Sequence, residues 1–494
     1  MLTDARLLPR STALNADICL IGAGPAGLTL AAKLHGLRVV LLESGGLYPA
    51  QDTAALAEGE IRGEPYWALE TSRLRCLGGT STHWTGWCRP LDAEVFAARD
   101  WVPNSGWPLT LDELVPYYRE AQRICGLGEL DYDPQRWAKR LGFPLLPLEG
   151  TAATTSLWQL SAPVRFGEKY KEQIASSPDL DAYLNATAVE LSTTARGERV
   201  EEVRAMTLNG NELRVRARAF VLATGGIDNA RLLLASQAPR GVGNASGLVG
   251  RFFMEHPHVV LGTLLCPKTD ALRVYEAAFP VPGAAPAALR ATLSVLPEVK
   301  RRERLLDCSV GLEPVVDSEP TALPQAVGAL NLARKFQGIE AEQCFELAGR
   351  AEQLPSLDSY LRLSDDRDAL GMPKTALFWK HDPRTLASLR RTVELLAEAL
   401  ARARLGRVYS YLHGGATRPG AWPEIFGGFH HMGTTRMHED RKRGVVNRDC
   451  RVHSVENLFI AGSSVFPSTG SANPTLTVVA LAARLADTLR RSFA

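Results

Sequence analysis

The chain has 494 residues, enough for two or more domains with sizeable hydrophobic cores. Lysine and arginine (56) exceed aspartate and glutamate (54) by only two, so the charge balance gives no reason to expect nucleic acid as a partner. The eight cysteines are scattered without a CxxC pair, which indicates reduced core residues and excludes the usual patterns of a disulfide framework or a metal site.

The sequence shows no pattern typical of a membrane span or a secretion signal. Its longest apolar runs, around Gly27 and Val478, are interrupted by charged residues within a helix length. Residues 1–15 lack the apolar core of a signal peptide. We therefore expect a cytoplasmic protein.

The N-terminal segment has the pattern of a dinucleotide-binding turn. An apolar strand runs into GAGPAG at 22–27, which opens an alanine-rich helix, and a second strand ends in Glu43. Gly22 permits a tight turn, Gly24 lets the backbone approach a pyrophosphate, and Gly27 lets the helix pack closely on the strand. The helix N-terminus would face the phosphates, and Glu43 would accept hydrogen bonds from ribose. The motif does not separate FAD from NAD.

Further along the chain, apolar patterns predict the rest of a nucleotide domain and a second domain. The expected elements are helices over about 111–124, 228–236 and 384–404, and strands over 182–191, 200–208, 212–217, 220–226 and 457–462. The strands at 220–226 and 457–462 are short and end in glycine, as is typical of a parallel sheet whose carboxyl ends face a ligand. The mixed region from about 259 to 429 is expected to face the substrate.

Two C-terminal stretches carry the residue types that alcohol oxidation needs. They are GGFHHMGTTRMHED at 427–440, which contains His430, and GSSVFPSTGSANPTLT at 462–477, which contains Asn473. A histidine can take the proton of an alcohol near neutral pH, and an asparagine amide can hold the oxygen that loses it. A hydride then remains, and a cofactor in the nucleotide site would accept it.

The chain resembles the glucose-methanol-choline (GMC) family of flavoprotein oxidoreductases, and within it the pyranose oxidases and related bacterial sugar oxidases. Besides the stretches above, the matching segments are RLRCLGGTSTHWTGWCRP at 73–90, WVPNSGWPLTLDELVPYY at 101–118, VLATGGIDNARLLLAS at 221–236 and GRFFMEHPHV at 250–259. The resemblance implies FAD and an α/β fold (α+β overall), with a Rossmann-like FAD-binding domain on a parallel sheet and a substrate domain on an antiparallel sheet with helices. The expected domains are 14–125, 180–258 and 430–494 for FAD, and 126–179 and 259–429 for the substrate.

The resemblance also assigns site residues. The family histidine three residues before Gly433-Thr434 is His430, which acts as the base, and its partner is Asn473. His431 stays an alternative base, because adjacent side chains on an extended segment point opposite ways. Other histidines are expected to be structural, namely His256, His258, His438 and His453. The residues expected to bind the cofactor are Gly22, Gly24, Gly27, Glu43, Gly78, Gly79, Thr80, His83, Trp84, Val189, Gly225, Gly462, Asn473, Pro474 and Thr475.

His83 is a special case among these residues. It lies in STHWT at 81–85, which resembles the pyranose oxidase segment whose histidine carries FAD through a covalent bond to the 8α carbon. A neutral imidazole nitrogen is a nucleophile, so such a bond is chemically accessible to His83. The alternative is a histidine that lies beside the flavin without a bond. Trp84 and Trp87 are equally consistent with pocket walls and with core residues.

The expected activity is oxidation of a secondary or primary hydroxyl of a sugar, glycoside or sugar-containing natural product, with hydride transfer to flavin N5 and O2 as final acceptor, giving H2O2. One alternative is a dehydrogenase that uses another electron acceptor. More remote alternatives are a non-redox lyase of the same fold and an NAD-linked dehydrogenase. The sequence leaves both a monomer and a dimer open.

Overall fold

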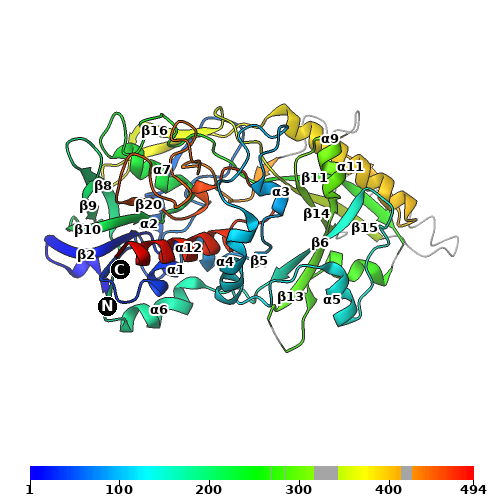
Figure 1. The fold of residues 1–494 in the computed structure, drawn as a ribbon, viewed down its shortest axis with the longest axis horizontal. Helices are drawn as coiled ribbons and strands as arrows, with labels where there is room; N and C mark the ends of the chain where they lie inside the picture. Colours follow the sequence, from blue (N-terminus) through cyan, green and yellow to red (C-terminus); the bar gives the residue numbers. More distant parts are fainter. Residues whose placement is uncertain (268, 284, 316–342, 413–424, 494) are drawn as a thin grey trace.

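The computed structural model describes residues 1–267, 269–283, 285–315, 343–412 and 425–493. Parts of the expected substrate domain, 316–342 and 413–424, lie outside the described residues. Figure 1 shows two lobes side by side: one holds both chain ends and the long helix α12, and the other holds β11, β14 and β15 with helix α11.

The first lobe is built on a mainly parallel sheet. Its strands follow the order β1-β7-β3-β2-β10-β9-β8, with β20 beside β10. The central strands β2 and β10 run parallel over their whole length, and β20 joins β10 at its carboxyl end, where β9 has already diverged. The strand bounds are β1 Leu2–Asp4, β2 Ser11–Ile21, β3 Val39–Leu42, β7 Leu180–Leu184, β8 Thr187–Thr193, β9 Val200–Met206, β10 Glu212–Leu222 and β20 Leu458–Ile460.

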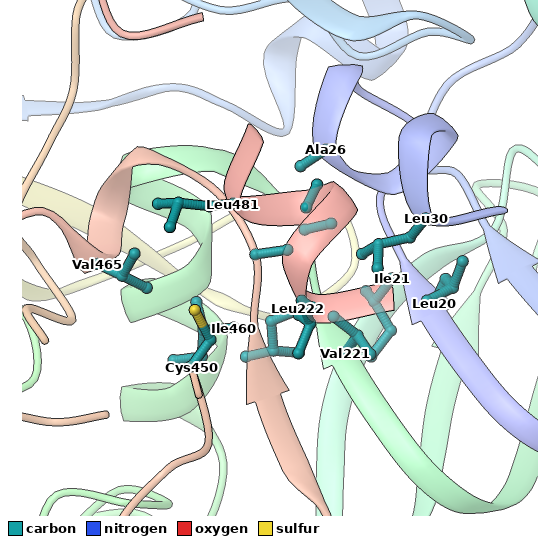
Figure 2. Close-up of a cluster of buried hydrophobic side chains, with 14 of the residues drawn as sticks. Leu20, Ile21, Ala26, Leu30, Val221, Leu222, Cys450, Ile460, Val465 and Leu481 are labelled. Carbon is teal, nitrogen blue, oxygen red and sulfur yellow. The ribbon is translucent and has the colours of Figure 1, made fainter. Parts of the chain in front are cut away.

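Helices pack on this sheet and bury its apolar side chains. The larger ones are α1 Pro25–Lys33, α4 Leu111–Ile124, α6 Phe166–Ser176, α7 Gly225–Ala235 and α12 Thr475–Phe493. Helix α1 packs against α12 and α6, and α12 packs against α4. Figure 2 shows one buried cluster that contains Ile21, Leu222 and Ile460, from the ends of three neighbouring strands, and Leu481 of α12. All four are almost fully buried, and burying such a side chain contributes about 1.5–3 kcal/mol.

The second lobe is built on an antiparallel sheet. Its strands follow the order β18-β11-β15-β14-β13-β6-β5, with β12 beside β13 and β19 beside β11. The bounds are β5 Trp87–Cys88, β6 Ala153–Leu160, β11 Pro257–Cys266, β12 Phe279–Pro280, β13 Ala288–Val295, β14 Cys308–Pro314, β15 Gln343–Ala351, β18 Arg407–Ser410 and β19 Phe426–Gly427. A smaller sheet contains β4 Gly59–Ile61, β16 Tyr360–Arg367 and β17 Pro373–Phe378.

The two faces of the second sheet differ in character. On β13, Leu289, Ala291 and Leu293 belong to an apolar cluster with residues of α11 (Pro383–Arg402). Because side chains alternate along a strand, Arg290 and Thr292 lie on the opposite face. This polar face also carries His258 and Arg350, which stand opposite each other on β11 and β15.

The remaining described helices are short. They are α2 Gln51–Ala55, α3 Ala93–Phe96, α5 Pro134–Leu141, α8 Arg273–Glu276 and α9 Pro297–Glu303, with 3-10 turns at Ala5–Leu7, Gly79–Thr82, Asp270–Leu272 and Ser463–Val465. Within the described ranges no helix has both the length and the apolar character needed to cross a bilayer. All eight cysteines are free thiols.

The expected elements are found with three differences. The expected strand over 182–191 is divided into β7 and β8, because Asn185 takes a positive φ of 58° and its amide donates to Asp4. The strands expected at 212–217 and 220–226 form one strand, β10, since β2 pairs along both parts. Helix α6 packs on the first lobe although it lies within the expected substrate segment 126–179.

Candidate active site

A cavity of about 440 Å³ joins the nucleotide turn to the C-terminal stretches. Its lining includes Gly22 and Gly24, which follow β2, and also His430 and Asn473. The sequence separates these pairs by some 400 residues, and the fold opens both into one space. The cavity therefore has room along its length for a cofactor that spans from the turn to the histidine.

The glycine turn has the geometry of a phosphate cradle. Gly22 has φ +102°, and a Cβ there would come within 2.6 Å of the Ala223 oxygen. A Cβ at Gly27 would lie 1.9 Å from the Gly22 oxygen, so Gly27 allows close packing and does not line the cavity. A Cβ at Gly24 would meet nothing within 4 Å. Gly24 is also the N-cap of α1 without a side-chain cap, which leaves N–H groups of the first turn for an anion.

Glu43 lies in the cavity wall beyond this turn. Its carboxylate accepts hydrogen bonds from the N–H groups of Ala23 (2.8 Å) and Gly45 (2.9 Å). Burial raises the pKa of Glu43 to about 7, while these two N–H groups and Arg75 act in the opposite direction. Each carboxylate oxygen has a further lone pair, so Glu43 can still accept a hydrogen bond from a ribose hydroxyl.

Asp228, which sequence analysis did not single out, connects helix α7 by ion pairs to residues 73–75, just before the loop 78–84 that is expected to contact the flavin. Arg73 Nε donates to it at 2.8 Å and Arg75 Nη2 at 3.0 Å, and Arg231 lies 3.9 Å away. Burial opposes ionisation of Asp228, but the three arginines outweigh it and hold its pKa well below the usual range. All four side chains line the cavity. Their positions along the chain show no local pattern that could have revealed the cluster.

The loop expected to contact the flavin is only partly at the cavity. Gly79, Thr80, His83 and Trp84 line it, as do Gly225 and Gly462 farther along the chain. Gly78 instead takes φ +96° and packs against Gly167, and Val189 lies in the core while its neighbours Thr187 and Ala188 reach the wall. The structure therefore does not bring Gly78 and Val189 to the cofactor space.

His83 and the two tryptophans all line the cavity. Partial burial and the nearby Arg165 lower the pKa of His83, so its ring is neutral at neutral pH. Trp84 is held by a hydrogen bond from its Nε1 to the Val164 oxygen at 2.8 Å. Trp87 lies at the start of the second sheet, so it forms part of the wall that the second lobe contributes.

His430 lies within a group of histidines. Its Nδ1 is 2.9 Å from Nδ1 of His256, and its ring centre is 6.2 Å from that of His258. Burial is the main cause that lowers the pKa of His430 well below its ordinary value. Electrostatic repulsion from His256 and His258 acts in the same direction. Its Nε2 makes no hydrogen bond to a described residue and is not enclosed, so it is the ring atom left for a ligand in the cavity.

His256 and His258 were expected to be structural, and the structure places both of them beside His430. The pairing of β11 with β19 sets Pro257 opposite Gly427, which brings both histidines beside the segment that carries His430. Burial lowers the pKa of His256 to about 4 and that of His258 to about 3. The segment GRFFMEHPHV was visible in the sequence, but its contact with residue 430 depends on this strand pairing.

Glu255 anchors the same segment from inside the protein. Its carboxylate accepts hydrogen bonds from the N–H groups of His256 (3.1 Å), Gly428 (3.1 Å) and His430 (3.0 Å), and from the hydroxyl of Tyr66. Burial raises the pKa of Glu255 to about 7, and these donors oppose the rise. The carboxylate thus fixes the backbone on both sides of the two histidines.

His431 points to a different set of partners. Its Nε2 lies 3.0 Å from the hydroxyl of Tyr66, and its residue is 7% exposed. Burial, with Arg73 nearby, lowers its pKa to about 3. Because its Nε2 is engaged, His431 is less available to a ligand than His430, although both contribute to the cavity wall.

Asn473 lines the same cavity as His430 and lies just before α12. Asn473, Pro474 and Thr475 all line the cavity, and Oδ1 of Asn473 is buried without a hydrogen-bond partner among the residues that the structure describes. Helices α1, α7 and α12 all begin at this cavity, so three helix N-termini surround it. An open glycine turn, a carboxylate for ribose, helix N-termini for phosphate and an unpaired amide at the far end together fit FAD.

Comparisons with known proteins bear on the family and the fold of the chain. Residues 355–482 match the family model described as GMC oxidoreductase. The chain is 25% identical to the 2-methyl-1,2-propanediol dehydrogenase of Mycolicibacterium austroafricanum, over 97% of this chain and 95% of that protein. It is 28% identical to the paromamine 6'-oxidase of Streptomyces fradiae, over 95% and 90%. The fold is similar to that of pyridoxine 4-oxidase from Mesorbium loti, with a TM-score of 0.61, 18% identity and coverage of 97% and 99%.

The similarity to the two relatives and to the solved structure spans nearly the whole length of the chain. The structural match confirms the predicted fold class, with a Rossmann-like domain and an antiparallel second sheet. The predicted resemblance to the GMC family is confirmed as well. Residues 355–482 carry a GMC oxidoreductase domain, and the chain is similar over nearly its whole length to the dehydrogenase and the oxidase named above.

Proposed function

We propose that this enzyme oxidises a hydroxyl group of a sugar or glycoside to a carbonyl. The observation that carries the proposal is the presence of His430 and Asn473 in the same cavity as the glycine turn. When bound, FAD supplies the acceptor for the hydride of the substrate carbon. Loss of a proton from the hydroxyl and of a hydride from its carbon leaves a carbonyl, so the atoms and electrons balance.

His430 acts as the base in this proposal. Its Nδ1 is occupied by His256, so Nε2 takes the proton of the substrate hydroxyl. The lowered pKa keeps the ring neutral, and therefore ready to accept a proton, at neutral pH. The hydrogen bond from its main-chain N–H to Glu255 holds the residue in place while the proton moves.

Asn473 binds the oxygen that loses the proton. As negative charge grows on this oxygen, a hydrogen bond from the Asn473 amide strengthens, and the N-terminus of α12 adds positive potential from the same side. The pair thus stabilises the alkoxide-like state from which the hydride leaves. This arrangement also fixes which carbon of the substrate presents its hydrogen to the cofactor.

A sugar or glycoside fits the cavity walls better than a small diol. Trp84 and Trp87 both line the cavity, and indole rings stack well on the apolar faces of sugars. The paromamine 6'-oxidase is a relative that acts on a sugar-containing compound. We propose O2 as the final electron acceptor. The second candidate is another electron acceptor, because one of the relatives is named as a dehydrogenase.

We also propose that His83 is covalently attached to the flavin. Its ring lines the cavity, and its lowered pKa makes the neutral, nucleophilic form dominant. We further propose that the first sheet and its helices form the FAD-binding domain and that the second sheet faces the substrate. Helix α6 then belongs to the FAD-binding domain.

The test is a panel of sugars, glycosides and simple diols added to the purified protein without oxygen. An oxidoreductase should lose its yellow flavin colour with the matching compound, and admission of air should restore the colour and produce peroxide. Conversion of a compound with the colour unchanged would instead identify a lyase. A colour that returns only with an added quinone or dye would identify a dehydrogenase, and a purified protein without flavin absorbance would contradict the proposal.

A further inference from the structure

The polar face of the second sheet carries two arginines beside one wall tryptophan. Arg290 on β13 and Arg350 on β15 hold their guanidinium groups 5.1 and 4.9 Å from the ring centre of Trp87. Arg290 is well partnered: it forms an ion pair with Glu313 at 2.8 Å and donates to two main-chain carbonyl oxygens. The ion pair with Arg290 uses Oε2 of Glu313, and the same carboxylate also acts favourably on the charge of Arg350.

Arg350 lacks such partners among the described residues. Its Nη1 is buried and makes no hydrogen bond to them. Burial lowers the pKa of Arg350, and Glu313 opposes this only in part because Arg290 acts in the same direction as burial. An unpaired, largely buried charge is destabilising, so proteins keep one mainly where a ligand neutralises it.

Arg350 also lies close to the residues that carry the chemistry. It stands directly opposite His258 in the register of β11 and β15, so the two side chains share one face of the sheet. The ring of His258 is 6.2 Å from that of His430, and Trp87 lines the cavity. Arg350 itself does not line the cavity, but Trp87, whose ring its guanidinium group contacts, does, so a ligand against Trp87 lies one side chain away from this arginine.

The chemistry of the free guanidinium selects the ligand group. Its planar N–H groups match the two oxygens of a carboxylate, which would also neutralise the charge. A neutral hydroxyl would accept a hydrogen bond but leave the charge unbalanced, and a polycationic amino sugar would be repelled. We propose, resting on the function above, that Arg350 binds a carboxylate of the substrate, so that the enzyme acts on an acidic sugar or on a glycoside with an acidic aglycone.

The test compares ligands that differ in charge alone. Phenyl β-D-glucopyranoside, its 4-carboxyphenyl analogue and its 4-(aminomethyl)phenyl analogue share one sugar, and D-glucose with D-glucuronate places the charge on the sugar itself. Each is titrated into the flavin-loaded enzyme without oxygen, and Kd is read from the change in the flavin spectrum. We expect a carboxylate in at least one pair to bind about 10- to 100-fold more tightly than its neutral counterpart, the range of a charge-assisted hydrogen bond, and the cation to bind most weakly.

Variants connect the preference to the residue. Arg350→Gln should remove the difference between acid and neutral ligand and leave the Kd of the neutral ligand within about threefold. Arg350→Lys should keep part of it, because it retains the charge without the planar geometry. The matched control is Arg362→Gln, since Arg362 stacks on Phe378 at 4.9 Å on an exposed strand away from the cavity.

The outcomes separate this inference from the proposed function. Equal Kd values for acid and neutral ligands in the unmodified enzyme, or a preference that survives in Arg350→Gln, would overturn the role of Arg350 even if neutral sugars bleach the flavin. Tight binding of the acid that is lost in Arg350→Gln, without bleaching by any compound, would support Arg350 and overturn the hydride transfer. If Arg350→Gln failed to retain flavin, Arg350→Lys would supply the comparison.

Discussion

His256 and His430 meet through their Nδ1 atoms at 2.9 Å, although 174 residues separate them in the sequence. Both rings are neutral at neutral pH, so one nitrogen of this contact donates and the other accepts. The main chain of Gly470 favours a proton on the His256 ring. If that proton is on Nε2 of His256, its Nδ1 accepts from His430, and Nε2 of His430 is left unprotonated, as a base requires.

We predict that His256 acts as a positioning residue for His430. His256→Ala should slow flavin reduction by about 10- to 100-fold, the usual effect of losing an orienting partner, with flavin content unchanged. His256→Asn, whose amide can keep one hydrogen bond, should recover part of the rate. The measurement is stopped-flow reduction across pH, and a His256→Ala profile identical to that of the unmodified enzyme would remove the contact from the mechanism.

Replacement of the base should have a larger effect. His430→Ala should lower the rate of flavin reduction by about two to four powers of ten, and part of the rate should return at high pH, where solvent can take the proton. His431→Ala is the matched control, because its ring is held by Tyr66. An inactive His431→Ala with a normal His430→Ala would reverse the assignment, and two normal variants would exclude a histidine base.

The pH dependence follows from the same residue. The pKa of His430 is lowered well below its ordinary value of about 6.5, and a base works when unprotonated. The reduction rate of the unmodified enzyme should therefore be flat from about pH 6.5 upward and decline only in more acidic solution. A rate that still increased steeply between about pH 7 and 9 would show that the proton acceptor titrates there and is not this histidine.

Asn473 should affect the rate of flavin reduction only through its hydrogen bond to the substrate oxygen, and it should not affect the binding of FAD. Asn473→Ala should cost about two to three powers of ten in reduction rate, the scale for one donor to a developing oxyanion. FAD should stay bound, since its phosphates are expected at the glycine turn at the far end of the cavity. Flavin absorbance and stopped-flow reduction measure the two effects separately, and loss of FAD with a normal residual rate would make Asn473 a binding residue.

The proposed link to His83 has a direct readout. The denatured protein should keep flavin fluorescence on a gel, and His83→Ala should release FAD on denaturation while retaining reduced activity, because the redox chemistry belongs to the flavin ring. Acid precipitation of the unmodified protein that frees all of its flavin would exclude a covalent bond.

The Asp228 cluster should matter for stability more than for chemistry. Asp228→Ala leaves Arg73 and Arg75 buried without their carboxylate, so we expect a loss of about 3–5 kcal/mol in unfolding free energy and weaker retention of FAD. The matched control is Asp358→Ala, which removes an exposed pair with Lys380 and should change stability by less than about 1 kcal/mol. Thermal unfolding followed by flavin fluorescence compares the two, and equal shifts would contradict a structural role for Asp228.

Sequence alone could predict the features that depend on local spacing. The glycine turn, α4 and α11 follow from short-range patterns, and the family motifs pointed to His430 and Asn473. The role of His256 could not be seen, because it depends on the pairing of β11 with β19. Gly78 and Val189 were expected to contact the cofactor. In the structure Gly78 packs against Gly167 and Val189 is buried in the core, and neither arrangement can be seen in the local sequence.

The arrangement of β20 and α12 has a consequence for how the protein is made. The glycine turn is synthesised early, whereas β20 and α12, which lie beside β10 and α1, come from residues 458–493. A growing chain therefore exposes the apolar flanks of β10 and α1 on the ribosome until these later residues emerge, and it cannot enclose the cofactor before then. Flavin capture should thus follow the emergence of residues 458–493 from the ribosome, and nascent chains should depend on chaperones until then.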